Sequence, residues 1–524
     1  MKKIFTLLAL ALGAATASAA DYTDVLSVNV NGMVSEQQAT ISLNQASDGS
    51  YEFSLKNFML VMGESSLGIG TIQLNGVEGT TADGVTTLYT SQSTKIQAGD
   101  ADGVSQWMGP MLPEVPIVMT AKIENGSLYA AINIDMTSTL SQKIQVMFGE
   151  RGYQLPNSGF ENYKEYKVTQ GLFLNPKEVT VDEPLSWHSF ASATGKLVDT
   201  ANKASSNPHT FVSNVVRPGS TGSKSVLVVS SSALGIVANG TITTGRMNAG
   251  AIQANDLANH AELDMSKTET DGNGDPFYAV MNGRPDSLAV WVKYKQSSVV
   301  EDFPYATISA AITDGTYYQD PNDNTYKNVL ATACDTTIES NGFAWQRISV
   351  PFNYVDKSIK GKAILVTIST NAGAGKGTTA DSIYVDDAEL IYNASLLSAK
   401  VGGKEVTFSA PGDTAEVEGL TAVKVEDIET VTNANGADVA TTLANVGDDI
   451  VATVKVTSSD LKTVNFYSIK FKNANVSGIS DAKAGANDKV KAIYSIDGVK
   501  VNAMQSGNVY IVVYESGKTQ KVVR

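Results

Sequence analysis

The sequence predicts an all-β protein. Apolar and polar residues alternate along short runs such as Leu26–Val30 and Leu128–Met136, and a period of two is that of a strand with one buried face. Asn-Gly and Asp-Gly pairs such as Asn125-Gly126 separate these runs, and both residues tolerate the positive φ of a tight hairpin. Long runs with a helical period are nearly absent. Strands at this spacing indicate sandwiches or barrels.

The composition fits several packed domains and excludes other classes. The chain has 524 residues, of which 42% are hydrophobic and 18% charged, so it is not mainly disordered. Its length suggests about three or four domains. A formal charge of −15 disfavours nucleic acid as a partner, because an acidic surface repels phosphates. The single cysteine, Cys334, excludes an internal disulfide and is expected to be a small core residue.

Residues 1–20 are predicted to be a secretory signal peptide. Lys2 and Lys3 precede the apolar run Ile4–Leu12, and Ala17-Ser18-Ala19 supplies small residues for cleavage. The run is too short to span a bilayer, and no later stretch approaches about 20 apolar residues. We therefore expect a chain that is exported to the cell surface or beyond, without a membrane-spanning segment.

Breaks in composition divide the rest of the chain into four units. We place them at residues 21–148, 150–393, 394–474 and 488–524. Residues 475–487 have few large apolar side chains and are predicted to be a linker.

The first unit carries four segments in a specific order, Leu55–Phe58, Gly68–Ile72, Leu112–Val118 and Gly126–Met136. In this order they resemble the calycin-like domain of secreted Bacteroidetes proteins. The resemblance implies a small β-barrel, whose interior either holds a ligand or is filled by its own side chains.

The second unit resembles a Bacteroidetes domain family named for carbohydrate metabolism. The matching segments are Trp187–Phe190, Arg217–Gly219, Pro276-Phe277, Gly283–Pro285, Leu288–Lys295, Trp345–Tyr354 and Ser382–Tyr392. The resemblance implies a jelly-roll sandwich similar to carbohydrate-binding modules.

The last two units are shorter. Alternating apolar residues between 406 and 471 make residues 394–474 resemble a small Ig-like sandwich. Residues 488–524 contain two strand pairs around Asp497-Gly498 and Ser516-Gly517, with a basic ending. They resemble the C-terminal sorting domains of Bacteroidetes, which implies secretion machinery as a partner; the alternative is an ordinary terminal pair of hairpins.

Tryptophans of the second unit are the candidate sugar platforms, because a saccharide stacks its C–H face on an exposed aromatic ring. In Leu288–Lys295, the aliphatic residues fall on one face, and Trp291 shares the other with Lys293 and Lys295. The alternative for Trp291 is packing under a loop or a neighbouring domain.

Four further residues complete the predicted carbohydrate-binding set. Trp345 and Arg347 share one face of a strand, where the guanidinium could donate to vicinal hydroxyls. Trp187 and Arg284 come from other matching segments. The alternatives are tryptophans that fill the end of the sandwich, and an Arg284 that caps backbone carbonyls.

Metal is a weaker prediction, and no cofactor is certain. Asp386 is the candidate ligand of a structural calcium ion. Asp386 and Asp387 should point to opposite faces of their strand, so one of them at most serves a site. The alternative is an acidic strand end paired with Lys or Arg. The loop Asp271–Asp275 lacks the later carboxylate of a calcium loop and is interpreted as a polar loop.

We therefore predict an exported protein whose jelly-roll binds a glycan without catalysis. One alternative is a glycoside hydrolase that uses a carboxylate pair, with Glu301-Asp302 and Asp182-Glu183 as candidates. The other is a structural or adhesive surface protein without a sugar site. No catalytic residue is predicted.

Overall fold

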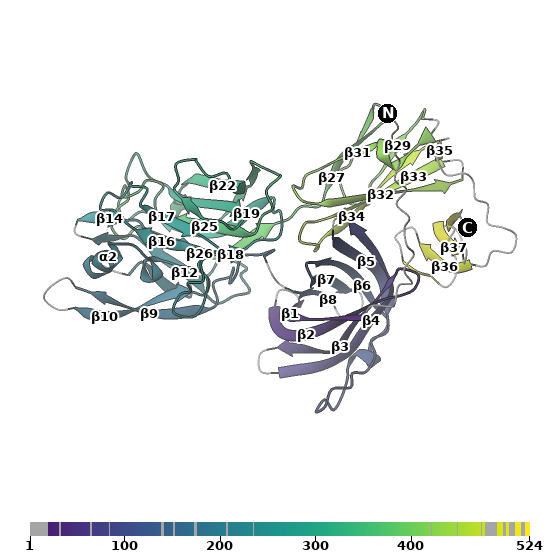
Figure 1. The fold of residues 1–524 in the computed structure, drawn as a ribbon, viewed down its shortest axis with the longest axis horizontal. Helices are drawn as coiled ribbons and strands as arrows, with labels where there is room; N and C mark the ends of the chain where they lie inside the picture. Colours follow the sequence, from purple (N-terminus) through teal and green to yellow (C-terminus); the bar gives the residue numbers. More distant parts are fainter. Residues whose placement is uncertain are drawn as a thin grey trace, which may run out of the picture.

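A computed structural model describes most of the chain between Ala19 and Val523. The residues left out are 1–18, 31–32, 63–64, 83, 138–140, 150–151, 172–175, 206–207, 234, 421, 448, 473, 477–489, 496–498, 502–508, 515–518 and 524. Most of the predicted signal peptide and linker thus lies outside the described residues. Strands dominate the described part, which confirms the all-β prediction (Figure 1). None of its helices has the length and apolarity that a membrane crossing needs.

Eight antiparallel strands close into a barrel at the N-terminal end of the described chain. They are β1 (Ala19–Val30), β2 (Met33–Gln45), β3 (Tyr51–Met62), β4 (Ser65–Ala82), β5 (Val85–Thr94), β6 (Val115–Glu124), β7 (Ser127–Met136) and β8 (Gln142–Phe148). Closure comes from β1, which pairs with both β2 and β8. Asn125 (φ 52°) and Gly126 (φ 77°) form the predicted two-residue turn between β6 and β7.

The barrel interior is packed with its own side chains. Inward residues such as Leu26, Phe53 and Leu88 are completely buried in one apolar cluster. A cavity of about 470 Å³ lies in the wall at β1, β2 and β3, with Leu55 and Phe58 among its lining residues. Pairing of β2 with β3 runs only from Gln45 to Ile41, and this leaves the gap.

Two sheets of the second unit pack face to face. The front sheet has the order β11 (Thr210–Ser213), β12 (Ser225–Val229), β26 (Ser382–Ile391), β19 (Ser287–Lys295) and β23 (Gln346–Pro351). The back sheet has the order β15 (Thr241–Thr243), β25 (Ala363–Ser369), β20 (Ala306–Thr313), β22 (Val329–Ile338) and β24 (Asn353–Tyr354), with β18 (Ala279–Val280) beside β25. Both contribute to one apolar core, in which Val290 of the front sheet and Ile308 of the back sheet are completely buried.

Smaller elements surround this sandwich. They are the hairpins β9 (Tyr163–Gln170)–β10 (Lys177–Pro184) and β13 (Ser231–Ala233)–β14 (Ile236–Ala238), and the sheet β16 (Arg246–Ala249)–β17 (Asn259–Leu263)–β21 (Tyr318–Asp320). The helix α2 (Val198–Ala204) and 3-10 turns at Phe190–Ser192 and Asn341–Phe343 belong to the same unit, while others lie at Gly109–Met111 and Val425–Asp427.

The third unit is a smaller sandwich. One sheet is β28 (Lys404–Thr407)–β27 (Leu396–Val401)–β31 (Ile428–Thr432), and the other is β29 (Thr414–Val417)–β34 (Val464–Phe471)–β33 (Asp449–Thr457)–β32 (Asp438–Val446), with the pair β30 (Ala422–Val423)–β35 (Asn475–Val476). A separate sheet, β36 (Val490–Ser495)–β37 (Val509–Tyr514)–β38 (Thr519–Val523), ends the described chain.

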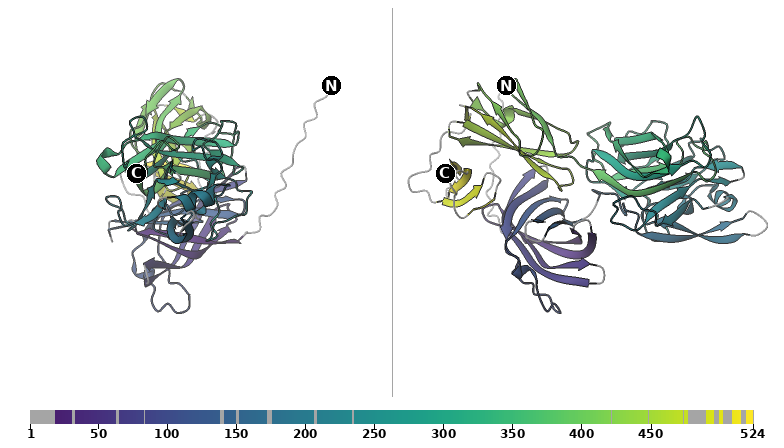
Figure 2. Two further views of the ribbon diagram at one scale, coloured as in Figure 1. Left: turned by 90° about the vertical axis from the view of Figure 1, so that its left-hand side faces the viewer. Right: turned by 180° about the vertical axis from the view of Figure 1, so that it is seen from behind.

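The third unit contacts both larger units, as the views in Figures 1 and 2 agree. Tyr89 of the barrel lies 6.1 Å from Phe466, measured between ring centroids. Leu461 is buried in a cluster with Tyr129 of the barrel and Tyr153, whose rings stack at 4.2 Å. On the sandwich, Asp286 accepts hydrogen bonds from the backbone and side chain of Asn435.

Candidate functional site

The outward side of the front sheet carries the predicted tryptophans. On β19, Leu288, Val290, Val292 and Tyr294 are at most 1% exposed and form the core side. Trp291 and Lys293, between them, are half-buried, and Lys295 is exposed. Alternation along β19 therefore places one aromatic ring and two ammonium groups on the outward side, as the sequence predicts.

Neighbouring strands add further rings to this side. Trp291 pairs with Arg347 of β23, and Lys293 pairs with Tyr384 of β26; residues paired across antiparallel strands share a face. Phe343 and Trp345 precede β23 and contact Tyr384, with ring centroids 6.0 and 6.4 Å away. We name this surface the aromatic face; it consists of Trp291, Lys293, Lys295, Phe343, Trp345, Arg347 and Tyr384.

Cations lie over the rings of the aromatic face. Lys293 Nζ is 4.4 Å from the centroid of Phe343 and 5.6 Å from that of Tyr384. Lys295 Nζ is 4.6 Å from the Phe343 centroid. Attraction between an ammonium group and the ring quadrupole stabilises this arrangement. The lysines are therefore held beside the rings.

Arginines and carboxylates meet at the Trp291 end of the face. Arg217, from the loop before β12, lies 5.5 Å from the centroid of Trp291, and its Nε donates to Asp387. Arg347 Nη2 donates to Glu389 Oε1 over 3.1 Å. The half-buried carboxylate of Asp387 and the exposed carboxylate of Glu389 are thus ion-paired.

The side chains of Asp386 and Asp387 do not point to opposite faces of their strand, contrary to what the sequence predicts. The register of β19 with β26 shifts between Ala289 and Trp291, so β26 holds an extra residue there, and Asp387 has φ 43°. This bulge turns both aspartates toward Arg217, rather than toward opposite faces. Asp386 is completely buried and accepts from the Arg217 backbone N–H over 2.9 Å, and burial raises its pKa to about 6.

The described residues provide no set of ligands for the predicted calcium ion. Within the described parts of the chain, no group of three or more His, Cys, Asp or Glu side chains is arranged to hold a metal ion. Asp386 is bonded to a backbone N–H, and Asp387 to a guanidinium. The alternative, an acidic strand end paired with a basic residue, describes Asp387.

Trp187 is not a sugar platform, and this part of the prediction is wrong. Its side chain is completely buried, and its indole Nε1 donates to the Pro156 carbonyl over 3.0 Å. Phe160 packs against the ring at 5.1 Å. The residue follows β10 and enters the sandwich core, where no saccharide could reach it.

Arg284 serves a contact between units. Its backbone N–H donates to Ser459 Oγ over 3.0 Å, and its Nη2 donates to the Lys357 carbonyl over 3.1 Å. The carbonyl-capping alternative therefore describes it, and the structure does not bring it to the aromatic face.

Cys334 is exposed instead of buried, contrary to the prediction of a core residue. Ala331 and Ala333 take the inward positions of β22.

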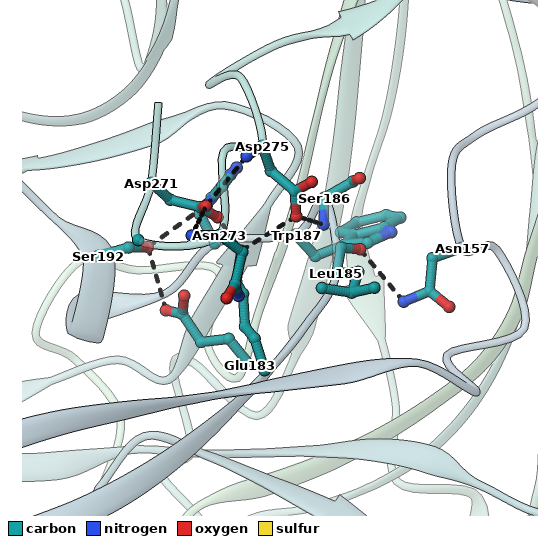
Figure 3. Close-up of polar contacts among 12 residues, drawn as sticks. Asn157, Glu183, Leu185, Ser186, Trp187, Ser192, Asp271, Asn273 and Asp275 are labelled. Carbon is teal, nitrogen blue, oxygen red and sulfur yellow. Dashed lines mark hydrogen bonds and ion pairs between the residues drawn. The ribbon is translucent and has the colours of Figure 1, made fainter. Parts of the chain in front are cut away.

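A second polar cluster lies between the hairpin β9–β10 and loop 271–275, and Figure 3 shows its polar contacts. The Lys164 ammonium forms an ion pair with Asp271, and these side chains are 1% and 0% exposed. Asp275 accepts from the Ser186 backbone N–H over 2.8 Å. Glu183 is also buried and accepts from Ser192 Oγ over 3.2 Å. The partners Lys164 and Asp271 are 107 residues apart in the chain, so no sequence motif indicates this cluster.

The cluster contains Ser, His and Asp side chains but not the arrangement of a catalytic triad. His188 Nδ1 lies 3.4 Å from Ser192 Oγ and 3.6 Å from Asp271 Oδ2, while Nε2 faces the Pro276 carbonyl. A triad needs the serine and the aspartate on opposite ring nitrogens. Burial lowers the His188 pKa to about 4, so the ring is neutral near pH 7. The cluster fixes loop 271–275 to the sandwich.

Comparison with known proteins identifies one domain. Residues 19–150 match the family described as calycin-like beta-barrel domain. The closed eight-stranded barrel covers this segment, so the chain carries a calycin-like domain there.

The other comparisons add no function. No curated protein matches the chain. Among solved structures, the functional form of the mosquito-larvicidal Cry4Aa toxin from Bacillus thuringiensis has 9% sequence identity over 70% of this chain and a TM-score of 0.14. The chain spans 52% of that toxin chain. A TM-score this low does not indicate a shared fold.

Proposed function

We propose that the sandwich binds a glycan without catalysis, on the aromatic face of its front sheet. The observation that carries the proposal is the gathering of Trp291, Phe343, Trp345 and Tyr384 on one side of the sheet, all half-buried. Each ring is anchored by packing and keeps some surface in contact with solvent.

This arrangement suits saccharides on physical grounds. A pyranose ring presents apolar C–H groups to an aromatic ring and hydroxyls to its rim. Arg347 supplies rim donors, since its guanidinium is exposed beside Glu389. Rings that are already held by their neighbours lose little side-chain entropy on binding. A shallow face buries little ligand surface, so the expected affinity is weak.

The carboxylates beside the aromatic face favour binding over hydrolysis. A glycosidase needs one protonated acid and one carboxylate facing each other across a cleft. Asp387 and Glu389 are instead each ion-paired with an arginine, Asp387 with Arg217 and Glu389 with Arg347. These contacts are those of two separate ion pairs and not of two carboxyl groups that act together on one substrate.

Affinity gel electrophoresis of the full chain against a panel of plant, algal and host polysaccharides tests the proposal. We expect at least one polysaccharide to retard the chain, and Trp291→Ala and Trp345→Ala to reduce that retardation. Tyr317→Ala is the matched control, because Tyr317 is an exposed ring outside the aromatic face. Equal retardation of all four proteins on every polysaccharide would remove the assignment.

We further propose that this binding takes place outside the cytoplasm of a Bacteroidetes-like cell. The support is the basic start, apolar run and small residues before Ala20, together with the resemblance of residues 488–524 to sorting domains. The barrel and the third unit then act as spacers or secondary binders. Mass spectrometry of the protein from culture medium tests export; we expect peptides that begin at or near Asp21, and recovery only from the cytoplasm would contradict it.

A further inference from the structure

The charges on the aromatic face are divided between its two ends. Carboxylates lie at the Trp291 end, where Arg217 and Arg347 pair with Asp387 and Glu389. Lys293 and Lys295 lie at the other end, over Phe343. Among the residues that the structure describes, no carboxylate lies within 4.0 Å of either lysine ammonium.

A nearby buried acid does not neutralise these lysines. Asp381 precedes Ser382, which pairs with Lys295. Its side chain is completely buried and accepts hydrogen bonds from the backbone N–H groups of Ser297 and Thr378. The lysine end of the face therefore presents uncompensated positive charge, in a chain whose formal charge is −15.

Trp345 lies beside this charge. Its ring and the Lys293 ammonium both contact Tyr384, at 6.4 and 5.6 Å from the Tyr384 centroid. A sugar stacked on Trp345 would hold its ring substituents near Lys293. An ammonium group has three donors and forms its strongest hydrogen bonds with anionic oxygens.

We propose that the aromatic face selects acidic glycans, with the carboxylate of a uronic acid residue beside Lys293 and Lys295. This inference rests on the proposed function and names its ligand class. The net negative charge of the chain repels polyanions elsewhere, so selectivity for an acidic glycan has to come from this end of the face.

Two polysaccharides with the same backbone, one charged and one neutral, provide the test. Polygalacturonic acid and its methyl ester share the sugar ring and linkage, but only the acid carries carboxylates. We expect the full chain to bind the acid at least about tenfold more tightly, as measured by isothermal titration calorimetry per galacturonate residue. We expect the preference to shrink as NaCl rises, because salt screens exposed charges.

Substitutions test whether Lys293 and Lys295 cause the preference for the acidic polymer. The double variant Lys293→Met and Lys295→Met keeps the long side chains and removes both charges, and we expect it to bind the two polymers equally. Lys267→Met, an exposed lysine in the turn after β17, should keep the wild-type preference. Trp345→Ala should weaken binding to both polymers.

The outcomes separate this inference from the proposed function. Equal wild-type affinity for the acid and the ester, or binding of neutral glycans alone, overturns the acidic selectivity and leaves glycan binding intact. Failure to bind any polysaccharide overturns both. Tighter binding of a sulfated galactan than of polygalacturonic acid, or of oligo(dT) than of any glycan, also contradicts a uronate ligand.

Discussion

The buried side chains of Asp386, His188 and His209 contribute to the pH dependence of the free energy of unfolding. The folded-state pKa of Asp386 is raised to about 6 by burial, so the folded protein binds more protons than the unfolded chain between about pH 4 and 6, and stability falls as pH rises through that window. His209 and His188 act oppositely: burial lowers each pKa to about 4, so their contribution is lost as pH falls below about 6.5.

Asp386→Asn isolates the first contribution. The amide can still accept from the Arg217 N–H and carries no charge. We expect the variant to be more stable than the wild type at pH 7.5, by up to about 3 kcal/mol, and equally stable at pH 4. Thermal unfolding across this pH range measures the difference, and a variant that is less stable at pH 7.5 would contradict it.

Lys164 compensates a buried carboxylate. Removing one partner of a buried ion pair leaves the other charge without compensation, at a cost of about 3–5 kcal/mol. We expect Lys164→Met to lower the free energy of unfolding of the sandwich by this amount, as measured by urea denaturation. Combination with Asp271→Asn should recover part of the loss, because no charge then remains at the pair. A cost no larger than that of Lys167→Met, which breaks an exposed pair with Glu178, would be inconsistent with this role.

Among the elements, the bulge in β26 decides how the Trp291 end of the face is built. Asp387 has a positive φ, which a β-branched residue adopts only at a cost. We therefore expect Asp387→Val to destabilise the sandwich by about 1–3 kcal/mol and to release Arg217 from the Trp291 ring. Asp387→Asn, which tolerates this conformation, should cost less. Thermal midpoints and a Trp fluorescence spectrum compare them; equal effects of the two substitutions would argue against backbone strain.

The alternation of apolar and polar residues predicts the strands and their buried sides correctly where the strands are regular. The core side of β19 and the turn at Asn125-Gly126 follow from local sequence, because side chains alternate and tight turns need particular residues. The bulge at Asp387 could not be foreseen, since one inserted residue reverses the alternation after it. Trp187 lies outside regular strands, where periodicity gives no orientation.

The candidate site was only partly predictable for a related reason. The neighbours of Trp291 and Trp345 along the chain predict a polar strand face for each. Phe343 and Tyr384 join them through pairing between distant strands, which a single sequence does not reveal. The buried pair of Lys164 and Asp271 depends on the same long-range packing.

Over the whole molecule, the third unit joins the barrel to the sandwich. Tyr89 of the barrel contacts Phe466 and lies under the Lys455 ammonium at 4.5 Å, and Leu461 is buried against Tyr129. Burial lowers the Lys455 pKa. These contacts bury apolar surface between the units, so the barrel and the third unit should unfold together.

Calorimetric unfolding tests this coupling. The variant with Tyr89→Ala and Leu461→Ala removes apolar contacts that we expect to be worth about 2–5 kcal/mol. We expect the shared transition of the wild type to split into two, with the barrel and the third unit melting separately. Tyr89→Phe keeps the ring and should keep the shared transition. An unsplit transition in the double variant would show that other contacts couple the units.

The central claim is that the aromatic face receives a sugar ring. The most direct measurement is calorimetric titration of the full chain with the polysaccharide that retards it most, for the wild type beside Trp345→Ala. The account predicts a saturable signal that weakens at least about tenfold in the variant, which is the loss of one stacking contact, with an unchanged thermal midpoint. Superimposable titration curves for the two proteins would contradict it.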